Sequence, residues 1–544
     1  MKMQRREFLR VVAVGGGAAF IVACAPGVIS PSAEPSQTSQ AGGRPLSPAG
    51  GAPKRGGMLR ARGTQLVHLD TTISQVGPEL GLVYSRLLNE RADFYEDTVK
   101  VPGLIEKWEV SADGLVYTLH VRSGVKWHNV APVNGRPFTA SDVAWNIDYY
   151  SKSSIRASNF AAIDHYEVVD PLTIKIYLKY VFAPFMDSIS YQHIGMVPRE
   201  VFEADGNFRQ RAIGTGPFMW DVWQKDSLIR LKANPDYWEL GADGKPLPYV
   251  SALEFSILGD DASAQAAFRS GKLDMIGGNL SDMKALKAAQ PGILAEDGFR
   301  ANAIWLQMNM RVKPWDDVRV RQAASLAIDQ QEIISSHLDG DSIASGLIPS
   351  SLRDFAWQPD EVLKRYPQNI AKAKQLLADA GQTGLKVDLS LYTGPNDAAG
   401  AQIVQRNMNA AGFDVTIKTV PTLSVGQEIV RNRTYQLVFF TASSSFEVDD
   451  WTYLFWHSKG GRNLQGYSSP EMDRLTEAQR SATDPAKRKA LIGQIQDLML
   501  KDMVAAPLAH ISRQHYLLNP VVKNFKTFHW VLAWPHLKDA WVDR

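Results

Sequence analysis

The stretch from Lys386 to Ser443 constrains the fold of this chain more than any other. It begins with the alternating run KVDLSLYTG, continues with the helical pattern AAGAQIVQRNMNAAG, and returns to an alternating run in FDVTIKTV. The continuous apolar run YQLVFFTAS follows, and such a run is typical of a strand in a sheet that helices cover on both faces. Strand, helix and strand in this order predict an α/β layer.

A second region predicts a different kind of sheet. In LTIKIYLK, from Leu172 to Lys179, apolar and polar residues alternate, which is typical of a sheet with one face in water. The segment FTASDVAWNIDYY before it predicts an amphipathic helix, with Thr139 or Ser141 as the N-cap.

Three helices are predicted nearer the C-terminus. The run DDVRVRQAASLAIDQQEIISSHL, residues 316–338, predicts one long helix. Ser469 before Pro470 and Asp484 before Pro485 predict two further helix starts, because each pair puts a capping side chain ahead of a proline in the first turn.

The N-terminus has the pattern of an export signal. Arg5 and Arg6 precede the weakly apolar run VVAVGGGAAFIVA, whose length of about a dozen residues is too short to span a bilayer. The run ends at Cys24, the single cysteine of the chain, in a context that resembles a lipoprotein processing box. We expect residues 1–23 to be a twin-arginine-like signal, Cys24 to carry the lipid anchor, and the Pro- and Ser-rich residues 24–55 to form a flexible tether.

Length and charge narrow the class of protein further. A chain of 544 residues is long enough for more than one domain. Its formal net charge is +2, and the first 23 residues contribute four basic residues against one acidic residue, or +3, which leaves −1 for the rest. Residues 24–544 thus have almost no net charge, whereas a nucleic-acid-binding protein needs a positively charged surface, so a nucleic-acid partner is not expected.

The sequence offers no convincing catalytic or metal-binding motif. It contains neither HExxH nor GxxxxGK[ST], and one cysteine cannot build a cysteine-based metal site. Asp449 and Asp450 are adjacent, so their side chains diverge and do not form the facing pair that a glycosidase needs. We expect no enzyme activity, no cofactor and no metal, and we interpret the two aspartates as residues at the entry of a helix.

Several segments, in this order, resemble the family 5 extracytoplasmic solute-binding proteins, the dipeptide and oligopeptide type that serve ABC importers. They are VPGLIEKWEVSADGLVYTLHVRSGVKWH with PFTASDVAWNI, then GTGPF and NPDYW, DDVRVRQAASLAID, AKAKQLLADAG, and finally GYSSPEMDRL with DPAKRKALIGQIQDLM. The resemblance covers nearly everything from Gly56 to the C-terminus.

This resemblance implies an α/β fold of two lobes that close on a ligand by a hinge motion, the two-lobed periplasmic-binding-protein fold, with an extra domain inserted in the first lobe. The first lobe would comprise residues 56–90, 214–310 and 515–544. The β-rich residues 91–213 would form the inserted domain, and residues 311–514 the second lobe.

Candidate ligand contacts follow partly from the sheet. Ligands of open α/β sheets bind at the carboxyl ends of the strands, which here are LYTGPN and TASSSFE. The candidates at these ends are Tyr392, Ser443, Phe446 and Glu447, with Trp451 just beyond them. An aromatic ring at these positions suits the hydrophobic core as well as a pocket.

The resemblance adds three weaker candidates and a question about the ligand. Gln75 and Val76 match an early pocket loop of the family, and Trp305 lies near the crossing between the lobes.

Peptide-binding members place an aspartate just before the segment that matches DDWTYLF, where it pairs with the α-ammonium group of the peptide. Phe446 takes that position here, with Glu447 beside it, and Ser443 stands where some members have tryptophan. A buried ammonium without a partner costs several kcal/mol. Unless Glu447 supplies the carboxylate, an oligosaccharide or another neutral solute is therefore a serious rival to a peptide.

The resemblance implies an extracytoplasmic receptor that captures a peptide, or one of these other solutes, and delivers it to the permease subunits of an ABC transporter. We expect a monomer, held to membrane lipid through Cys24, in the periplasm or on the outer face of the cytoplasmic membrane. Two alternatives remain: a cell-surface glycoside-active enzyme using Glu447 or the aspartate pair, and an adhesion or signalling module with the same fold.

Overall fold

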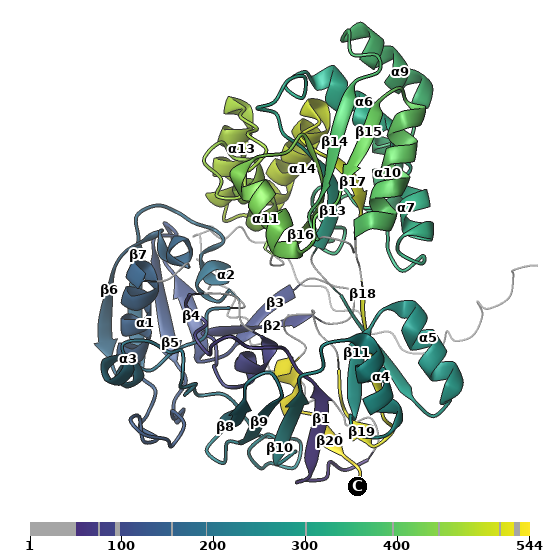
Figure 1. Cartoon of the computed structure of the whole chain (residues 1–544). Helices are drawn as coiled ribbons and strands as arrows, with labels where there is room; N and C mark the ends of the chain where they lie inside the picture. The colour runs from purple at the N-terminus through teal and green to yellow at the C-terminus, as the bar shows by residue number, and fades with distance from the viewer. Residues whose placement is uncertain are drawn as a thin grey trace, which may run out of the picture. The chain divides into compact units, whose positions relative to one another are not determined.

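The computed structural model of the chain describes residues 51–73, 77–92, 98–153, 156–191, 193–299, 302–393, 397–443, 447–510, 513–526 and 534–544. Its two large sheets belong to two α/β lobes (Figure 1). Among the described residues, every helix is too short or too polar to cross a lipid bilayer.

The first lobe is built on a mixed seven-stranded sheet. Strand β1 pairs in parallel with β10, while β18 runs antiparallel to both of its neighbours. Helices α4 (Asp261–Arg269) and α5 (Leu280–Ala289) pack on it through Phe268 and Leu286. The strand order is β12 (Leu294–Phe299), β18 (Arg513–Leu518), β11 (Met275–Gly278), β1 (Met58–Arg62), β10 (Ala252–Ser256), β9 (Leu228–Ala233) and β8 (Phe218–Gln224).

The second lobe is built on a five-stranded sheet. Strands β15, β14 and β16 run parallel to one another, and β13 and β17 complete the sheet in antiparallel pairs. The strand order is β15 (Asp414–Lys418), β14 (Lys386–Leu391), β16 (Leu437–Ser443), β13 (Asn302–Met308) and β17 (Ala506–Ala509).

Helices cover both faces of this second sheet (Figure 1). One hydrophobic cluster includes α6 (Val318–Ala327), α7 (Gln330–Ser336), α8 (Pro359–Arg365), α9 (Ile370–Asp379) and α10 (Ala398–Ala410). The opposite cluster includes residues of α11 (Leu423–Asn432), α12 (Asp449–Trp456), α13 (Pro470–Arg480) and α14 (Pro485–Asp502). Neighbouring residues of β16, such as Phe439 and Phe440, belong to opposite clusters, because successive side chains of a strand point to opposite faces. The prediction from YQLVFFTAS is confirmed.

The inserted domain contains a four-stranded antiparallel sheet in the order β4 (Ile105–Val110), β5 (Val116–Val121), β7 (Thr173–Leu178) and β6 (Ile163–Asp170). In β7, Ile174, Ile176 and Leu178 are buried and the residues between them are partly exposed, which confirms the predicted alternation. Helices α1 (Ala140–Ser153), α2 (Phe185–Ile189) and α3 (Arg199–Asp205) accompany this sheet. Since α1 begins at Ala140, the residue directly before it is Thr139 and not Ser141.

The hydrophobic core of the inserted domain is continuous with that of the first lobe. One cluster joins Leu59 of β1 and Leu253 of β10 to Ile174 and Ile176 of β7. The hairpin of β2 (Leu88–Ala92) and β3 (Thr98–Pro102) lies across the predicted border at residue 91.

The chain crosses between the two large sheets twice. It passes from the first sheet to the second between β12 and β13, and it returns between β17 and β18. Strand β13 starts at Asn302 and lies in the second sheet, so the predicted border between residues 310 and 311 falls too late in the chain. The reason is that Asn302–Met308 pairs along its whole length with β16.

Side-chain caps mark several helix starts of the second lobe. Ser469 accepts a hydrogen bond from the N–H of Met472, and Asp484 accepts one from the N–H of Lys487, which confirms both predicted caps. The single long helix predicted for residues 316–338 is wrong: α6 ends at Ala327 and α7 begins at Gln330. Asp329 separates them because its side chain caps α7 by accepting from the N–H of Glu332.

Candidate ligand-binding site

The candidate site lies at the carboxyl ends of β14 and β16, which run parallel and end at Leu391 and Ser443. Parallel strands bring these ends to the same edge of the sheet, and the segments that follow them form the surroundings of any ligand bound there. Ser443 pairs through its backbone with Asn302 of β13, so this edge also adjoins one of the two passages between the lobes.

Tyr392 directly follows β14 and is held in place on two sides. Its backbone N–H donates to Asp397 Oδ2 at 3.1 Å, and its ring centroid lies 4.5 Å from that of Phe440. Burial raises the pKa of Tyr392 and that of Asp397, although hydrogen bonds from Thr393 partly oppose the rise at Asp397. The partly exposed Tyr392 ring is therefore a preorganised aromatic surface at the strand ends.

Trp305 and Trp451 lie inside the hydrophobic core. Both are 0% exposed, and their ring centroids are 6.4 Å apart. Trp305 also packs against Phe440 and Phe455, and its indole N–H donates to Gln307 Oε1 at 3.4 Å. The structure thus places both tryptophans behind the strand ends, and a direct ligand contact by either stays a prediction.

Glu447 forms an ion pair within the protein. Its Oε1 accepts hydrogen bonds from Arg488 and, at 3.0 Å, from the N–H of Asp449. Only 15% of the Glu447 side chain and 12% of the Arg488 side chain are exposed. A ligand ammonium at Glu447 has to share this carboxylate with Arg488.

The aspartate pair has a structural role at the start of α12. The helix begins at Asp449, so Asp449 and Asp450 occupy its first turn, as expected for helix-entry residues. The Asp449 carboxylate accepts hydrogen bonds from Nε and Nη2 of Arg480 on α13, each at 2.9 Å, and another from Gln479. Burial opposes the charge of Arg480, yet the Asp449 carboxylate raises its pKa overall.

Four further candidates are outside what can be described. Gln75, Val76 and Phe446 lie outside the described residues, as does the side chain of Ser443. Cys24 lies outside them as well. Their roles stay predictions.

A group of residues that the sequence did not single out lies in the first lobe and the inserted domain. Arg156 stacks on Tyr191, with 5.1 Å from Cζ to the ring centroid, and Tyr191 lies beside His193, with 5.6 Å between centroids. Burial and the nearby Arg156 and Arg86 lower the pKa of His193 to about 3. Arg86 and Arg156 lie far from the Tyr191–His193 segment in the chain, so no local motif joins them to it in the sequence.

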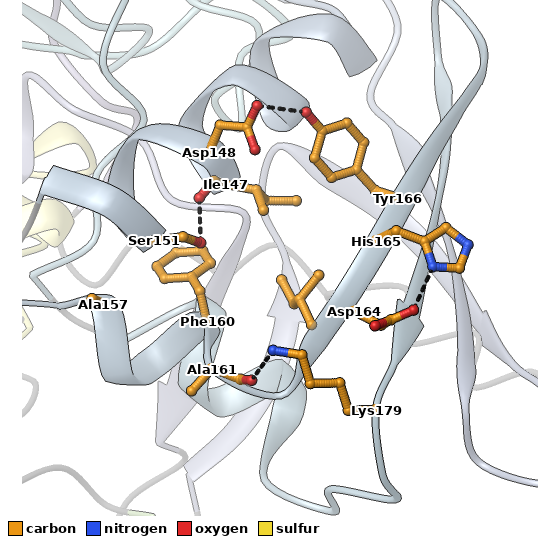
Figure 2. A pocket seen from close by; sticks show the side chains of 11 residues that line it. Ile147, Asp148, Ser151, Ala157, Phe160, Ala161, Asp164, His165, Tyr166 and Lys179 are labelled. Atoms are coloured by element: carbon orange, nitrogen blue, oxygen red, sulfur yellow. Dashed lines mark hydrogen bonds and ion pairs between the residues drawn. The ribbon is translucent and has the colours of Figure 1, made fainter.

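The inserted domain also has a surface hollow of about 680 Å³ (Figure 2). Its lining comes from α1, from residues 157–166 and from Lys179, so it belongs to this domain alone. The Tyr166 hydroxyl donates to Asp148 at 2.8 Å, and Lys179 donates to the carbonyl of Ala161 at 3.1 Å. Its polar groups thus already pair with one another. Within the described ranges, no group of three or more His, Cys, Asp or Glu side chains is arranged to hold a metal ion.

Comparisons with known proteins identify the class of this molecule. The chain is 28% identical over 467 residues to di/tripeptide-binding protein 3 of Pseudomonas aeruginosa (strain UCBPP-PA14), which covers 79% of this chain and 84% of that protein. It is 29% identical over 479 residues to the dipeptide-binding protein of Escherichia coli (strain K12), covering 81% of this chain and 86% of that protein.

Among solved structures, the chain is similar to the ABC transporter-associated periplasmic binding protein DppA from Helicobacter pylori in complex with peptide STSA. The TM-score is 0.75 at 24% identity, over 90% of this chain and 99% of that one. This likeness confirms the predicted two-lobed fold. A family model described as bacterial extracellular solute-binding proteins, family 5 Middle, matches residues 100–463. The chain therefore belongs to family 5 of the bacterial extracellular solute-binding proteins.

Proposed function

We propose that the protein is an extracytoplasmic receptor that captures a peptide between its two lobes and delivers it to the permease of an ABC transporter, without chemistry of its own. The observation that carries this proposal is the match, along most of the chain, to relatives named for the binding of dipeptides and tripeptides. The proposed ligand contacts are Tyr392 at the strand ends, together with Gln75, Val76, Ser443 and Phe446.

The pairing of Glu447 with Arg488 favours a second candidate ligand. In this arrangement the carboxylate next to Phe446 is already neutralised by an arginine. A peptide ammonium bound there gains less than it would beside an unpaired carboxylate. An oligosaccharide or another neutral solute has no ammonium group and does not need an unpaired carboxylate.

A ligand-dependent melting screen tests the choice. The purified protein is heated with dipeptides, tripeptides, longer peptides and oligosaccharides in separate wells. A ligand at one hundred times its Kd stabilises the folded state by about 2.7 kcal/mol, which gives a measurable rise in Tm. We expect peptides to raise Tm. A rise with oligosaccharides alone would replace the peptide by a sugar, and turnover of the sugar that Glu447→Gln abolishes would show an enzyme.

We also propose that Cys24 anchors the protein to membrane lipid. Two acyl chains on a processed cysteine provide stable anchoring, whereas a single chain holds only reversibly. Mass spectrometry of the membrane-extracted protein is expected to show an N-terminal Cys24 carrying lipid. Cys24→Ser is expected to release the protein from the membrane fraction, and an unmodified N-terminus at another residue would contradict the proposal.

A further inference from the structure

The inserted domain contacts the second lobe away from the two places where the chain passes between the sheets. The backbone N–H of Ala183, which follows β7, donates to the carbonyl of Arg480 at the end of α13, at 2.7 Å. Gly114, in the turn between β4 and β5, lies near the residues that follow α13, because a Cβ atom added there would be 3.8 Å from Thr483 Cγ2. Two loops of the inserted domain thus meet the C-terminal end of α13.

Arg480 contacts one aromatic ring from its own lobe and one from the inserted domain. Its Cζ lies 3.5 Å from the ring centroid of Tyr453 on α12 and 5.1 Å from that of Phe182. Phe182 is 7% exposed and the side chain of Arg480 is 21% exposed, so water has little access to this contact. A guanidinium group is attracted to the face of an aromatic ring, and more strongly where water is excluded.

Each partner is held in place by its own part of the molecule. Phe182 packs in the hydrophobic cluster that the first lobe and the inserted domain share. Arg480 is held within the second lobe by the Asp449 carboxylate and the Tyr453 ring. Moving the lobes apart would therefore separate Phe182 and Ala183 from Arg480 without dismantling the packing on either side. A contact of this kind can form and break as the lobes move.

The second-lobe half of this contact is also joined to the candidate ligand-binding site. Asp449, which accepts hydrogen bonds from Arg480, donates its backbone N–H to Glu447 Oε1 at 3.0 Å. Glu447 belongs to the segment between β16 and α12, at the edge where the candidate site lies. Direct contacts thus lead from the inserted domain through Arg480 and Asp449 to this edge.

We propose that Phe182 and Ala183 of the inserted domain and Arg480 of the second lobe form a latch that stabilises the closed arrangement of the two lobes. The latch opposes the hinge motion that separates the lobes, because its cation–π contact and its backbone hydrogen bond exist only when they lie together. A ligand held between the lobes favours the same arrangement, so latch and ligand act on one equilibrium. This last step rests on the proposed function, whereas the latch itself is expected in the ligand-free protein.

Distances between two spin labels test the latch in the ligand-free protein. The labels are attached to Glu167→Cys on β6 and Lys489→Cys on α14, two exposed positions, in protein that also carries Cys24→Ser. Double electron–electron resonance then gives the ratio of closed to open molecules. Phe182→Leu keeps an apolar side chain but removes the ring. We expect it to lower the ratio of closed to open molecules at least twofold.

Further variants assign the effect to the contact between Phe182 and Arg480. Arg480→Lys keeps the charge beside Asp449 but loses the planar group that stacks on a ring, and it is expected to lower the ratio in the same way. Both substitutions together are expected to act no more strongly than the stronger one alone, because each removes the same contact.

Tyr453→Leu is the matched control, because it removes the other ring from the same guanidinium within the second lobe. It is expected to leave the ratio of closed to open molecules unchanged. A ratio that neither Phe182→Leu nor Arg480→Lys lowers, or that Tyr453→Leu lowers equally, would overturn the latch.

Affinity tests the link between latch and ligand. Calorimetry is carried out with the dipeptide, tripeptide or oligosaccharide that gives the largest rise of Tm in the melting screen. A ligand that binds only the closed arrangement has an apparent Kd inversely proportional to the closed fraction. Phe182→Leu is therefore expected to weaken binding by the factor by which it lowers that fraction, and Tyr453→Leu not to weaken it.

The two measurements separate the latch from the proposed function. An affinity that does not follow the closed fraction would overturn the link between latch and ligand. Distances that change as expected, together with binding of oligosaccharides alone, would support the latch and overturn the proposed peptide ligand.

Discussion

Two buried ionisable residues of the first lobe and its inserted domain, Glu79 and His128, are stabilised differently from two largely buried carboxylates of the second lobe. In the first lobe and its inserted domain, Glu79 is 0% exposed and His128 is 1% exposed. Glu79 Oε1 accepts the N–H of Thr64 at 2.7 Å, and its Oε2 has no hydrogen-bond partner among the described residues. His128 is held by the backbone of the GTGPF segment, at 3.2 Å from the N of Gly214 and 3.0 Å from the O of Gly216.

In the second lobe, two largely buried carboxylates are each neutralised by an arginine. Asp449 pairs with Arg480 at 2.9 Å, and Glu447 pairs with Arg488. A buried pair holds its charges over a wide pH range, whereas a group held only by backbone dipoles changes charge when its shifted pKa is crossed. A change of pH should therefore act through His128 and Glu79, whereas Asp449 and Glu447 should be sensitive to the removal of the arginine partner.

The largest expected effect is the loss of a buried partner in the second lobe. Asp449→Ala leaves the Arg480 charge unpaired, and we expect a loss of about 3–5 kcal/mol in the free energy of unfolding, measured in urea. Glu471→Ala is the matched control, because it removes the acidic partner of another α13 arginine, Arg474, in a pair whose side chains are more than half exposed. Similar losses in the two variants would remove the distinction between buried and exposed pairs.

Acid should destabilise the inserted domain through His128. Burial lowers its pKa from 6.5 to about 4, so the folded state binds a proton less readily than the unfolded state. The stability that this group contributes is fully present above pH 6.5, and about 3 kcal/mol of it is lost as the pH falls to 4.

Hydrogen exchange from pH 7 to pH 4, corrected for intrinsic rates, is expected to show loss of protection first around residues 127–138 and 214–218. His128→Gln is expected to flatten this dependence, with His165→Gln, an exposed histidine of the same domain, as the control. Unchanged acid sensitivity in His128→Gln would locate the effect elsewhere.

Base should destabilise the first lobe through Glu79. Burial raises its pKa from 4.5 to about 7, so the folded state favours the protonated form. The resulting stability is present below pH 4.5 and declines as the pH rises through 7. Glu79→Gln imitates the protonated form, so its stability relative to the wild type should increase by about 2 kcal/mol between pH 5 and pH 8. A relative stability that is independent of pH, measured by urea unfolding at both pH values, would contradict the assignment.

The smallest effect concerns a neutral hydrogen bond in the second lobe. Ser469→Ala removes the cap of α13 and is expected to cost about 1 kcal/mol in urea unfolding. Because no proton is exchanged, the cost should be the same at pH 5 and pH 8. A strong pH dependence of this cost would show that the substitution changes the pKa of a neighbouring group.

The fold was predictable where local signals agree with the final packing. The alternation around Ile174, the apolar run that became β16, and the caps Ser469 and Asp484 each follow from neighbouring residues. The break at Asp329 was missed because helical periodicity continues through it, while a single side-chain hydrogen bond ends the helix. The border at β13 was missed because its pairing with β16 spans more than a hundred residues of sequence, which no local pattern reports.

For the candidate ligand-binding site, the sequence predicted the position at the strand ends but not the contacts that its side chains make. Strand ends in an α/β sheet point to Tyr392 and Glu447, but the arginine that neutralises Glu447 comes from α14. Aromatic residues at such ends do not reveal from sequence whether they face a ligand, and the structure places Trp305 and Trp451 in the core. The stacking of Arg156 on Tyr191 was missed because the two residues belong to different segments of the chain and meet only after folding.

The two passages of the chain between the sheets have a consequence for how this molecule can be taken apart. The second lobe is one uninterrupted segment, from Asn302 at the start of β13 to Ala509 at the end of β17, and these strands pair through Ile304 and Ala509. Its entry and exit are therefore adjacent. Such a segment can be excised as a single fragment, and the two flanking parts of the first lobe can be rejoined by a short linker, without cutting through either sheet.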